Sequence, residues 1–279
     1  MAFKSYAKIN LSLSVNKKNS RGLHEIQSVY CLIDLYDKIQ IKKSAKQTID
    51  KISISGPYSR HVNKLNNSVI KCLNLLRKYK LVSNYYSIKI QKNIPVFAGF
   101  GGGSSNAAKV LSVLIKKNVK KNILNSIYNE MGSDVRLFTY NRGYLKNLKT
   151  IKKIRNKYKF YFLFVYPNIR CSTKEVYSKV ENYSKKKEFF TQKFRTKNGF
   201  LNHLKDGKND LQAIVEKKYP LIRKLLLDIS KFKGCYFSRM TGSGSACYGL
   251  FFNKKCSKAA LKKLRKRYPN FLISIAKTI

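Results

Sequence analysis

The chain has 279 residues, and its 59 Lys and Arg against 13 Asp and Glu give a formal net charge of +46. Hydrophobic residues make up 43% of the chain and aromatic residues 13%, which excludes a wholly disordered, collagen, coiled-coil or low-complexity protein. The six scattered cysteines form no CxxC pair and no apolar run approaches 18 residues, so zinc ribbons, redox motifs and membrane helices have no support.

The first part of the chain predicts short strands and one helix. Alternating apolar residues predict strands over residues 1–15 and 26–33, with shorter pieces at 39–41, 52–54 and 88–90. Apolar residues recur with helical spacing between Asn67 and Tyr79, which predicts an amphipathic helix there.

The most informative stretch is Gly-Phe-Gly-Gly-Gly-Ser-Ser-Asn at residues 99–106. It separates a predicted strand from an amphipathic helix, and we expect Ser104 or Ser105 to cap that helix. Glycines let a phosphate approach several backbone N–H groups, and the helix N-terminus adds a positive dipole end. The stretch matches neither the Walker A loop nor the dinucleotide fingerprint nor the protein-kinase signatures. It predicts a phosphate-binding loop, with a simple glycine-rich turn as the alternative.

The second part predicts a further mixture of strands and helices. The Lys- and Asn-rich residues 146–159 indicate a boundary between domains at 1–152 and 153–279. We predict strands at residues 160–166, 248–252 and 271–276, and helices that begin at Pro220 and span residues 257–267. The polar, basic residues 182–198 predict a surface excursion. The pattern predicts an α+β fold.

Four features are candidates for chemistry. Asp134 is one of few acidic residues, and a carboxylate can accept or orient the proton of a hydroxyl that attacks phosphorus. Lys8 interrupts an apolar strand pattern and could keep that carboxylate ionised. His24 and the glycine cluster at residues 242–245 are weaker candidates. Each feature also has an ordinary structural explanation. Asp134 would be a surface residue, Lys8 an exposed residue of a strand, His24 a surface or core histidine, and residues 242–245 a tight turn.

The ordered set of motifs resembles the GHMP kinase superfamily. The segments that carry the resemblance span most of the chain, and they lie at residues 6–11, 22–26, 94–108, 132–135, 172–177, 209–211 and 240–246. The resemblance implies two domains, the N-terminal one similar to ribosomal protein S5 domain 2 and the C-terminal one ferredoxin-like, with the active site between them. It also implies ATP-dependent phosphorylation of the 2-hydroxyl of a cytidine-diphosphate methylerythritol in non-mevalonate isoprenoid biosynthesis. The Lys-Ile-Asn opening and Gly-x-His segment favour this substrate over homoserine, galactose or mevalonate.

The resemblance also implies roles for single residues. Lys8 and Asp134 match the catalytic pair. Asn10, His24, Thr173 and Tyr177 match the substrate site, where His24 would hydrogen-bond the cytosine and Tyr177 would stack on it. The ATP site would comprise Asn67, Lys92 and the loop Pro95, Val96, Phe97, Ala98, Gly99, Phe100, Gly101, Gly102, Gly103, Ser104 and Ser105. We expect Mg²⁺ to accompany ATP, but no residue identifies itself as a metal ligand.

The sequence departs from the family pattern at three places. Leu23 stands where an aromatic residue usually precedes the histidine, which changes one face of the cytosine site. Phe97 and Ala98 replace glycines, and Arg136 replaces a proline. An inactive homologue is therefore one alternative reading.

The high net positive charge suggests a second alternative to an active kinase, namely a basic nucleic-acid-binding protein on a kinase scaffold. The basic residues are spread over nearly every segment, however, and the bias towards Lys, Asn, Ile, Tyr and Phe is typical of an A+T-rich genome. We therefore expect a cytoplasmic enzyme with a small-molecule substrate, a monomer or homodimer, without a nucleic-acid or membrane partner. Another GHMP small-molecule kinase is the third alternative.

Overall fold

Both halves of the chain contain strands and helices in the computed structural model, which describes residues 2–20, 22–44, 48–115, 118–155, 158–188 and 196–279. The described chain divides into two compact units. The first unit comprises Met1–Ala7, Leu35–Val96 and Gly101–Thr139, and the second comprises Lys8–Asp34, Phe97–Phe100 and Tyr140–Ile279. The units therefore interleave along the chain, and the predicted boundary between residues 152 and 153 stays a prediction.

Two strands carry residues of both units. They are β1 (Ala2–Asn10) and the long β3 (His24–Ser44). Sequence analysis predicted two separate strands where β3 runs unbroken, because the intervening residues 34–38 lack the alternation that marks a strand. The predicted strand over residues 1–15 is in turn divided between β1 and β2 (Ser14–Lys18).

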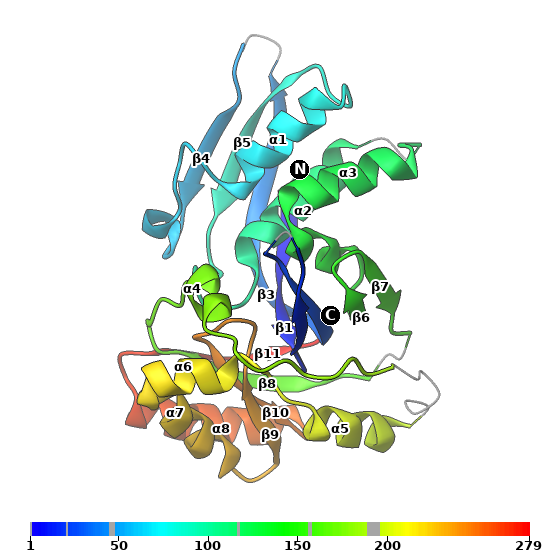
Figure 1. Ribbon diagram of the computed structural model, residues 1–279. Coiled ribbons are helices and arrows are strands. Elements are labelled where there is room, and N and C mark those ends of the chain that lie inside the picture. Colours follow the sequence, from blue (N-terminus) through cyan, green and yellow to red (C-terminus); the bar gives the residue numbers. More distant parts are fainter. Residues whose placement is uncertain (1, 21, 45–47, 116–117, 156–157, 189–195) are drawn as a thin grey trace. The chain divides into compact units, whose positions relative to one another are not determined.

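The first unit is a sheet covered by helices (Figure 1). Residues 38–44 of β3 pair antiparallel with β5 (Tyr85–Gln91), and β5 pairs in parallel with β4 (Lys51–Ser55). Its helices are α1 (Ser68–Lys78), α2 (Gly102–Leu114), α3 (Lys121–Met131) and the 3₁₀ helices η1 (Ser59–His61) and η2 (Ser133–Thr139). The core of this unit joins apolar side chains of β3 and β5 to those of the three α-helices, as the helical spacing predicts.

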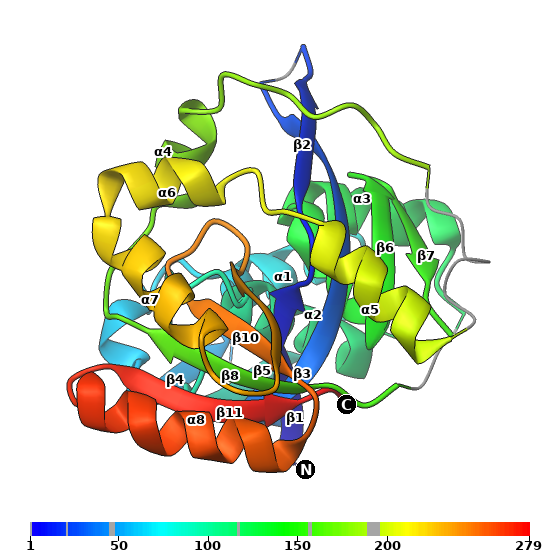
Figure 2. The same cartoon turned by 90° about the horizontal axis from the view of Figure 1, so that it is seen from below.

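The second unit contains a four-stranded antiparallel sheet in the order β11-β8-β10-β9. The apolar run at 160–166 forms the buried strand β8, which confirms its prediction. Helices α7 and α8 contact this sheet, and α8 runs along β11 in Figure 2. The bounds are β8 (Tyr161–Tyr166), β9 (Cys235–Met240), β10 (Cys247–Phe251), β11 (Leu272–Lys277), α7 (Pro220–Ser230) and α8 (Lys254–Arg267).

Smaller elements complete the second unit. The first part of β3 pairs antiparallel with β2 and with β6, and β6 pairs with β7. These elements are β6 (Arg142–Asn147), β7 (Thr150–Lys153), α4 (Thr173–Ser178), α5 (Lys197–Asp206) and α6 (Gln212–Lys218). Part of the predicted surface excursion, residues 189–195, lies outside the described residues. No helix within the described ranges is both long and apolar enough to cross a membrane.

Candidate functional site

The glycine stretch leads directly into helix α2, as the sequence predicts. The helix begins at Gly102, and Gly101 takes the N-cap position with a left-handed φ of +67°. The prediction that Ser104 or Ser105 caps the helix is wrong, because both serines lie inside its first turn. The first helical hydrogen bond runs from the Ser105 N–H to the Gly101 carbonyl at 2.9 Å. Helix geometry therefore leaves the N–H groups of Gly102, Gly103 and Ser104 without acceptors inside the helix, at the positive end of its dipole.

Ser105 anchors the helix to β1 instead of capping it. Its hydroxyl donates to the Tyr6 carbonyl at 2.6 Å and lies 2.7 Å from the Ser5 hydroxyl. All three residues belong to the first unit, and Ser105 is 3% exposed. The serine thus fixes the first turn of α2, which is a positioning role that the sequence did not reveal.

The loop residues before Gly101 pack against the second glycine cluster, residues 242–245. Gly99 has a φ of +81°, and a Cβ there would lie 2.0 Å from the Thr241 carbonyl oxygen, so only glycine fits. The Ala246 N–H donates to the Ala98 carbonyl at 3.2 Å. Two glycine-rich segments from distant parts of the sequence therefore meet within the second unit.

Asn209 organises this second cluster. Its side-chain amide donates to the carbonyls of Met240 and Gly242, both at 2.8 Å, and it is 6% exposed. The Asn-Asp-Leu segment was one of the motifs that carried the family resemblance, but no role could be assigned to it from sequence. In the structure, the Asn209 side chain holds the turn of the second glycine cluster in place through these two hydrogen bonds.

Lys8 and Asn10 form a buried polar pair in β1. Lys8 is 3% and Asn10 is 2% exposed, and the Lys8 ammonium donates to Asn10 Oδ1. The Lys8 N–H donates to the Phe100 carbonyl at 3.0 Å, and Phe100 immediately precedes Gly101. A Cβ on Gly242 would lie 3.3 Å from Lys8 Nζ, so the ammonium also lies beside the second cluster.

Three further bonds orient Asn10. Its side-chain amide donates to Ser28 Oγ at 2.7 Å, and its N–H donates to Thr241 Oγ1 at 3.0 Å. The Tyr248 hydroxyl donates to the Asn10 carbonyl at 3.0 Å. This fully bonded setting fixes where the predicted substrate ligand Asn10 can point.

Asp134 lies in η2, in the first unit, directly after Gly132 and Ser133. Gly132 has a φ of +113°, which favours glycine at this turn. Asp134 is half-buried. Its predicted partner Lys8 belongs to the second unit, so their cooperation stays a prediction.

An aromatic cluster surrounds His24 at the start of β3. The His24 ring lies 5.1 Å from the Tyr177 ring and 6.2 Å from the Tyr183 ring, the latter nearly parallel at 27°. Burial and the nearby Lys18 lower the His24 pKa below its ordinary value of 6.5. The structure thus brings together the two predicted residues His24 and Tyr177 and adds Tyr183, which sequence analysis missed.

The segment that carries Tyr183 is tied to the sheet. The Ser184 N–H donates to the Val15 carbonyl at 2.8 Å, and Gln27 exchanges two hydrogen bonds of 2.9 Å with the backbone of Lys187. Polar residues 182–198 predicted only a surface excursion, because nothing in that composition specifies these contacts. The fourth predicted substrate residue, Thr173, is the first residue of α4. Its hydroxyl oxygen lies 2.9 Å from the hydroxyl oxygen of Ser243.

The remaining predicted ATP ligands, Asn67 and Lys92, have defined structural contacts. Asn67 caps α1, since its side-chain oxygen accepts from the N–H groups of Val69 and Ile70 at 3.0 and 3.1 Å. Lys92 is 3% exposed and forms an ion pair with Asp37. Contact of either residue with ATP stays a prediction.

No group of three His, Cys, Asp or Glu side chains suited to a metal occurs in the part of the chain that the structure describes. Mg²⁺ needs only one or two carboxylates when substrate phosphates supply its other ligands. Asp134 is a carboxylate among the predicted site residues, so the donor set fits a cation that arrives with a nucleotide.

Comparison with known proteins covers nearly the whole chain. The model described as "GHMP kinases N terminal domain" matches residues 67–142, and "GHMP kinases C terminal" matches residues 197–270. A protein named 4-diphosphocytidyl-2-C-methyl-D-erythritol kinase from Pelagibacter ubique is 39% identical, over 99% of this chain and 98% of that protein. One of the same name from Wolbachia pipientis wMel is 33% identical, over 97% and 96%.

Solved structures show the same fold. The crystal structure of a 4-(cytidine 5'-diphospho)-2C-methyl-D-erythritol kinase superposes with a TM-score of 0.75 at 22% identity, covering 99% of each chain. A homoserine kinase from Cytophaga hutchinsonii superposes with a TM-score of 0.67 at 13% identity, over 100% of this chain and 93% of that one. These likenesses confirm the predicted α+β fold of two domains.

Proposed function

The chain belongs to the GHMP kinase family, and we propose that it transfers the γ-phosphoryl group of ATP to the 2-hydroxyl of 4-diphosphocytidyl-2-C-methyl-D-erythritol. The name shared by the relatives supports this substrate. The observation that carries the proposal is the start of α2, where Gly101 adopts a left-handed conformation and no side chain caps the helix. That terminus offers an anion three backbone N–H groups.

The phosphates of ATP bind the loop from Pro95 to Ser105. Amides of Gly102 to Ser104 would hold phosphate oxygens, and the dipole of α2 would stabilise their charge. The adjacent Phe100 carbonyl receives the Lys8 N–H, which fixes the start of this loop relative to β1. Asn67 and Lys92 serve the adenine end in this proposal, as the resemblance implies.

Lys8 and Asp134 carry the chemistry. The substrate oxygen forms a bond to the γ-phosphorus, the bond from that phosphorus to the β–γ bridging oxygen breaks, and ADP leaves. Asp134 accepts or orients the hydroxyl proton. The Lys8 ammonium stabilises the charge that develops on the phosphoryl oxygens. Its bond to Asn10 holds it in one direction before substrate arrives.

The cytidine end of the substrate binds the aromatic cluster. His24 would hydrogen-bond the base, and Tyr177 would stack on it, with Asn10 and Thr173 completing the polar contacts. The ring separation of 5.1 Å between His24 and Tyr177 supports a shared role for these two residues. Mg²⁺, when bound with ATP, would neutralise phosphate charge.

The decisive experiment is an ADP-release assay coupled to a second enzyme, with this substrate beside homoserine and mevalonate. We expect turnover with the cytidine-diphosphate alcohol and little with the other two. Turnover with homoserine or mevalonate instead would identify another kinase of the family. Nucleotide binding without turnover on any alcohol would identify an inactive homologue.

The domain organisation and environment complete the proposal. The two family models lie on opposite sides of the predicted boundary, which supports domains at 1–152 and 153–279. We still expect the protein to lie in the cytoplasm and to be a monomer or a homodimer. Size-exclusion chromatography with light scattering measures the oligomeric state.

A further inference from the structure

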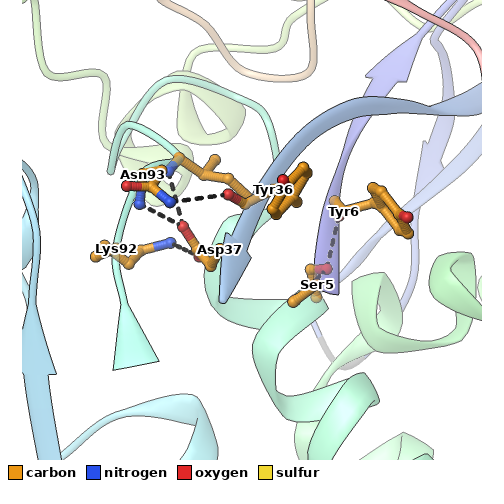
Figure 3. Close-up of polar contacts among 8 residues, drawn as sticks. Ser5, Tyr6, Tyr36, Asp37, Lys92 and Asn93 are labelled. Atoms are coloured by element: carbon orange, nitrogen blue, oxygen red, sulfur yellow. Dashed lines mark hydrogen bonds and ion pairs between the residues drawn. The ribbon is translucent and has the colours of Figure 1, made fainter. Parts of the chain in front are cut away.

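Asp37 lies on β3 and is fully buried, with 0% of its surface exposed. Its Oδ1 accepts the N–H groups of Asn93 at 2.7 Å and Ile94 at 2.8 Å, and its Oδ2 accepts the Lys92 ammonium. Figure 3 shows Asp37 at the centre of these contacts. One carboxylate therefore ties three consecutive residues, immediately after β5, to β3.

Those same residues lie against the start of α2. A Cβ built on Gly102 would lie 2.7 Å from Lys92 Nζ and 3.0 Å from Ile94 Cγ2. Gly102 is the first residue of the helix and a predicted phosphate ligand. All of these residues belong to the first unit, so the chain of contacts from Asp37 to Gly102 is complete within it.

The electrostatics favour a supporting role for this ion pair. The Lys92 side chain is 4% exposed and that of Asp37 is 0% exposed, so neither charge is screened by water. Burial lowers the Lys92 pKa, while the charge of Asp37 and its hydrogen bond to Lys92 oppose that shift. A neutralised buried pair contributes little net charge to a phosphate, but it fixes position strongly, since breaking it leaves one charge uncompensated.

We infer that Asp37 is a positioning residue of the kinase, which sets the phosphate-binding start of α2 through Lys92 and Ile94. The inference rests on the proposed function, because it assigns Asp37 to the ATP site. It requires no direct contact between Asp37 and nucleotide. It also explains why residue 102 is glycine, as the ammonium and a methyl group occupy the space of a side chain.

Asp37→Asn tests the inference. The amide oxygen can still accept backbone N–H groups, but the ammonium loses its counter-charge. Displacement of a positioning group by about 1 Å costs up to about 100-fold, and we expect kcat/KM for ATP to fall roughly 10–100-fold. We expect the KM for the alcohol, at saturating ATP, to stay within about twofold, because a displaced α2 terminus affects phosphate binding.

Asp50→Asn is the matched control. Asp50 accepts two bonds from Arg77 at 2.7 and 2.8 Å and one from the Tyr86 N–H at 2.8 Å, so it has the same kind of bonding within the same unit. We expect this variant to lose thermal stability but to keep its kcat/KM for ATP. An unchanged kcat/KM for ATP in Asp37→Asn, or an equal fall in Asp50→Asn, would overturn the inference.

A binding measurement covers the case in which Asp37→Asn does not fold. Asp37→Glu keeps a carboxylate for Lys92, so no buried charge is left uncompensated, but its longer side chain displaces residues 92–94. Calorimetric titration with ADP is expected to give a Kd at least about fivefold higher than wild type, and an equal Kd overturns the inference. Wild type that binds ADP but phosphorylates no alcohol contradicts the proposed function alone.

Discussion

Lys8 shows how a single residue separates two interpretations of a sequence pattern. A lysine in an apolar strand is ordinarily an exposed residue at a strand edge. Here it is 3% exposed and donates to Asn10, so the solvated interpretation is wrong. A buried ammonium must be bonded to be tolerated. The apolar residues on both sides of Lys8 were the signal for this burial, but its partner could not be predicted.

The Asp134 carboxylate is the residue on which the chemistry depends most. Acid–base assistance of this kind contributes about 10²–10⁴ to the rate. Asp134→Asn should lower kcat by about that factor while ADP binding, measured by calorimetry, stays within about twofold. Near-normal kcat in this variant would show that another group handles the proton.

Tyr183 is expected to contribute to recognition of the base. It is 43% exposed and nearly parallel to His24, so its ring can supply an aromatic face beside His24. An aromatic contact is worth about 0.5–1.5 kcal/mol, and Tyr183→Ala should raise the KM for the alcohol roughly three- to tenfold. Tyr236→Ala is the control, since Tyr236 contacts the Phe252 ring instead of His24. Equal effects of the two variants would contradict a specific role.

His24 predicts the pH dependence of substrate binding. Its pKa is lowered from 6.5, first by burial and then by Lys18, so the neutral ring predominates at and above that pH. Protonation removes the acceptor nitrogen of the ring, so the KM for the alcohol should rise mainly on acidification below pH 6.5. His24→Asn should abolish that rise. A KM that already increases well above pH 6.5 would assign the dependence to another group.

At the scale of elements, the start of α2 combines a correct prediction with an error. The run of glycines before an amphipathic pattern correctly predicted a loop that enters a helix. The cap was misassigned because serine is a common N-cap residue, whereas here Gly101 adopts the left-handed conformation and the helix begins three residues before Ser105. The preference of serine for an N-cap position depends only on neighbouring residues. The Ser105 hydroxyl instead bonds to Tyr6 of β1, which lies 99 residues earlier in the chain.

Contacts between residues that are far apart in the sequence also limited the prediction of other elements and site residues. Periodicity gave α1, α7 and the buried β8, because these features depend on neighbouring residues. Asp37 could not be assigned, since its partners lie 55 to 57 residues away. The glycine loop, Lys8 and Asp134 were candidates from the residues themselves, whereas their pairing and the other site residues came from motif resemblance.

Ser105→Ala tests the anchoring of α2. The substitution removes the partner of the buried Ser5 hydroxyl and of the Tyr6 carbonyl. An unsatisfied buried polar group costs about 1–3 kcal/mol, so the free energy of unfolding in urea should fall by about that amount. Ser112→Ala, on the exposed face of the same helix, should change it by less than about 0.5 kcal/mol. Equal losses in the two variants would contradict a specific anchoring role of Ser105.

At the scale of the whole molecule, the net charge of +46 predicts nonspecific attraction to polyanions. Such binding releases counterions, so the logarithm of the affinity for RNA should fall linearly with the logarithm of salt concentration. We expect filter binding to show weak RNA affinity at physiological salt that is equal in wild type and Asp134→Asn. Salt-resistant, sequence-selective RNA binding would favour the nucleic-acid-binding alternative.

The passage of β1 and β3 through both compact units has a consequence for dissection of this enzyme. A fragment that ends at residue 152 would keep every segment of the first unit, but it would also carry residues 8–34 and 97–100, some of whose partners lie in the missing half. Leu13 and Ala98 would lose their backbone hydrogen bonds with Lys208 and Ala246, and the Gly99 carbonyl would lose the bond from the Thr241 hydroxyl. No single cut yields two self-sufficient halves, so fragment complementation would need both pieces present while they fold.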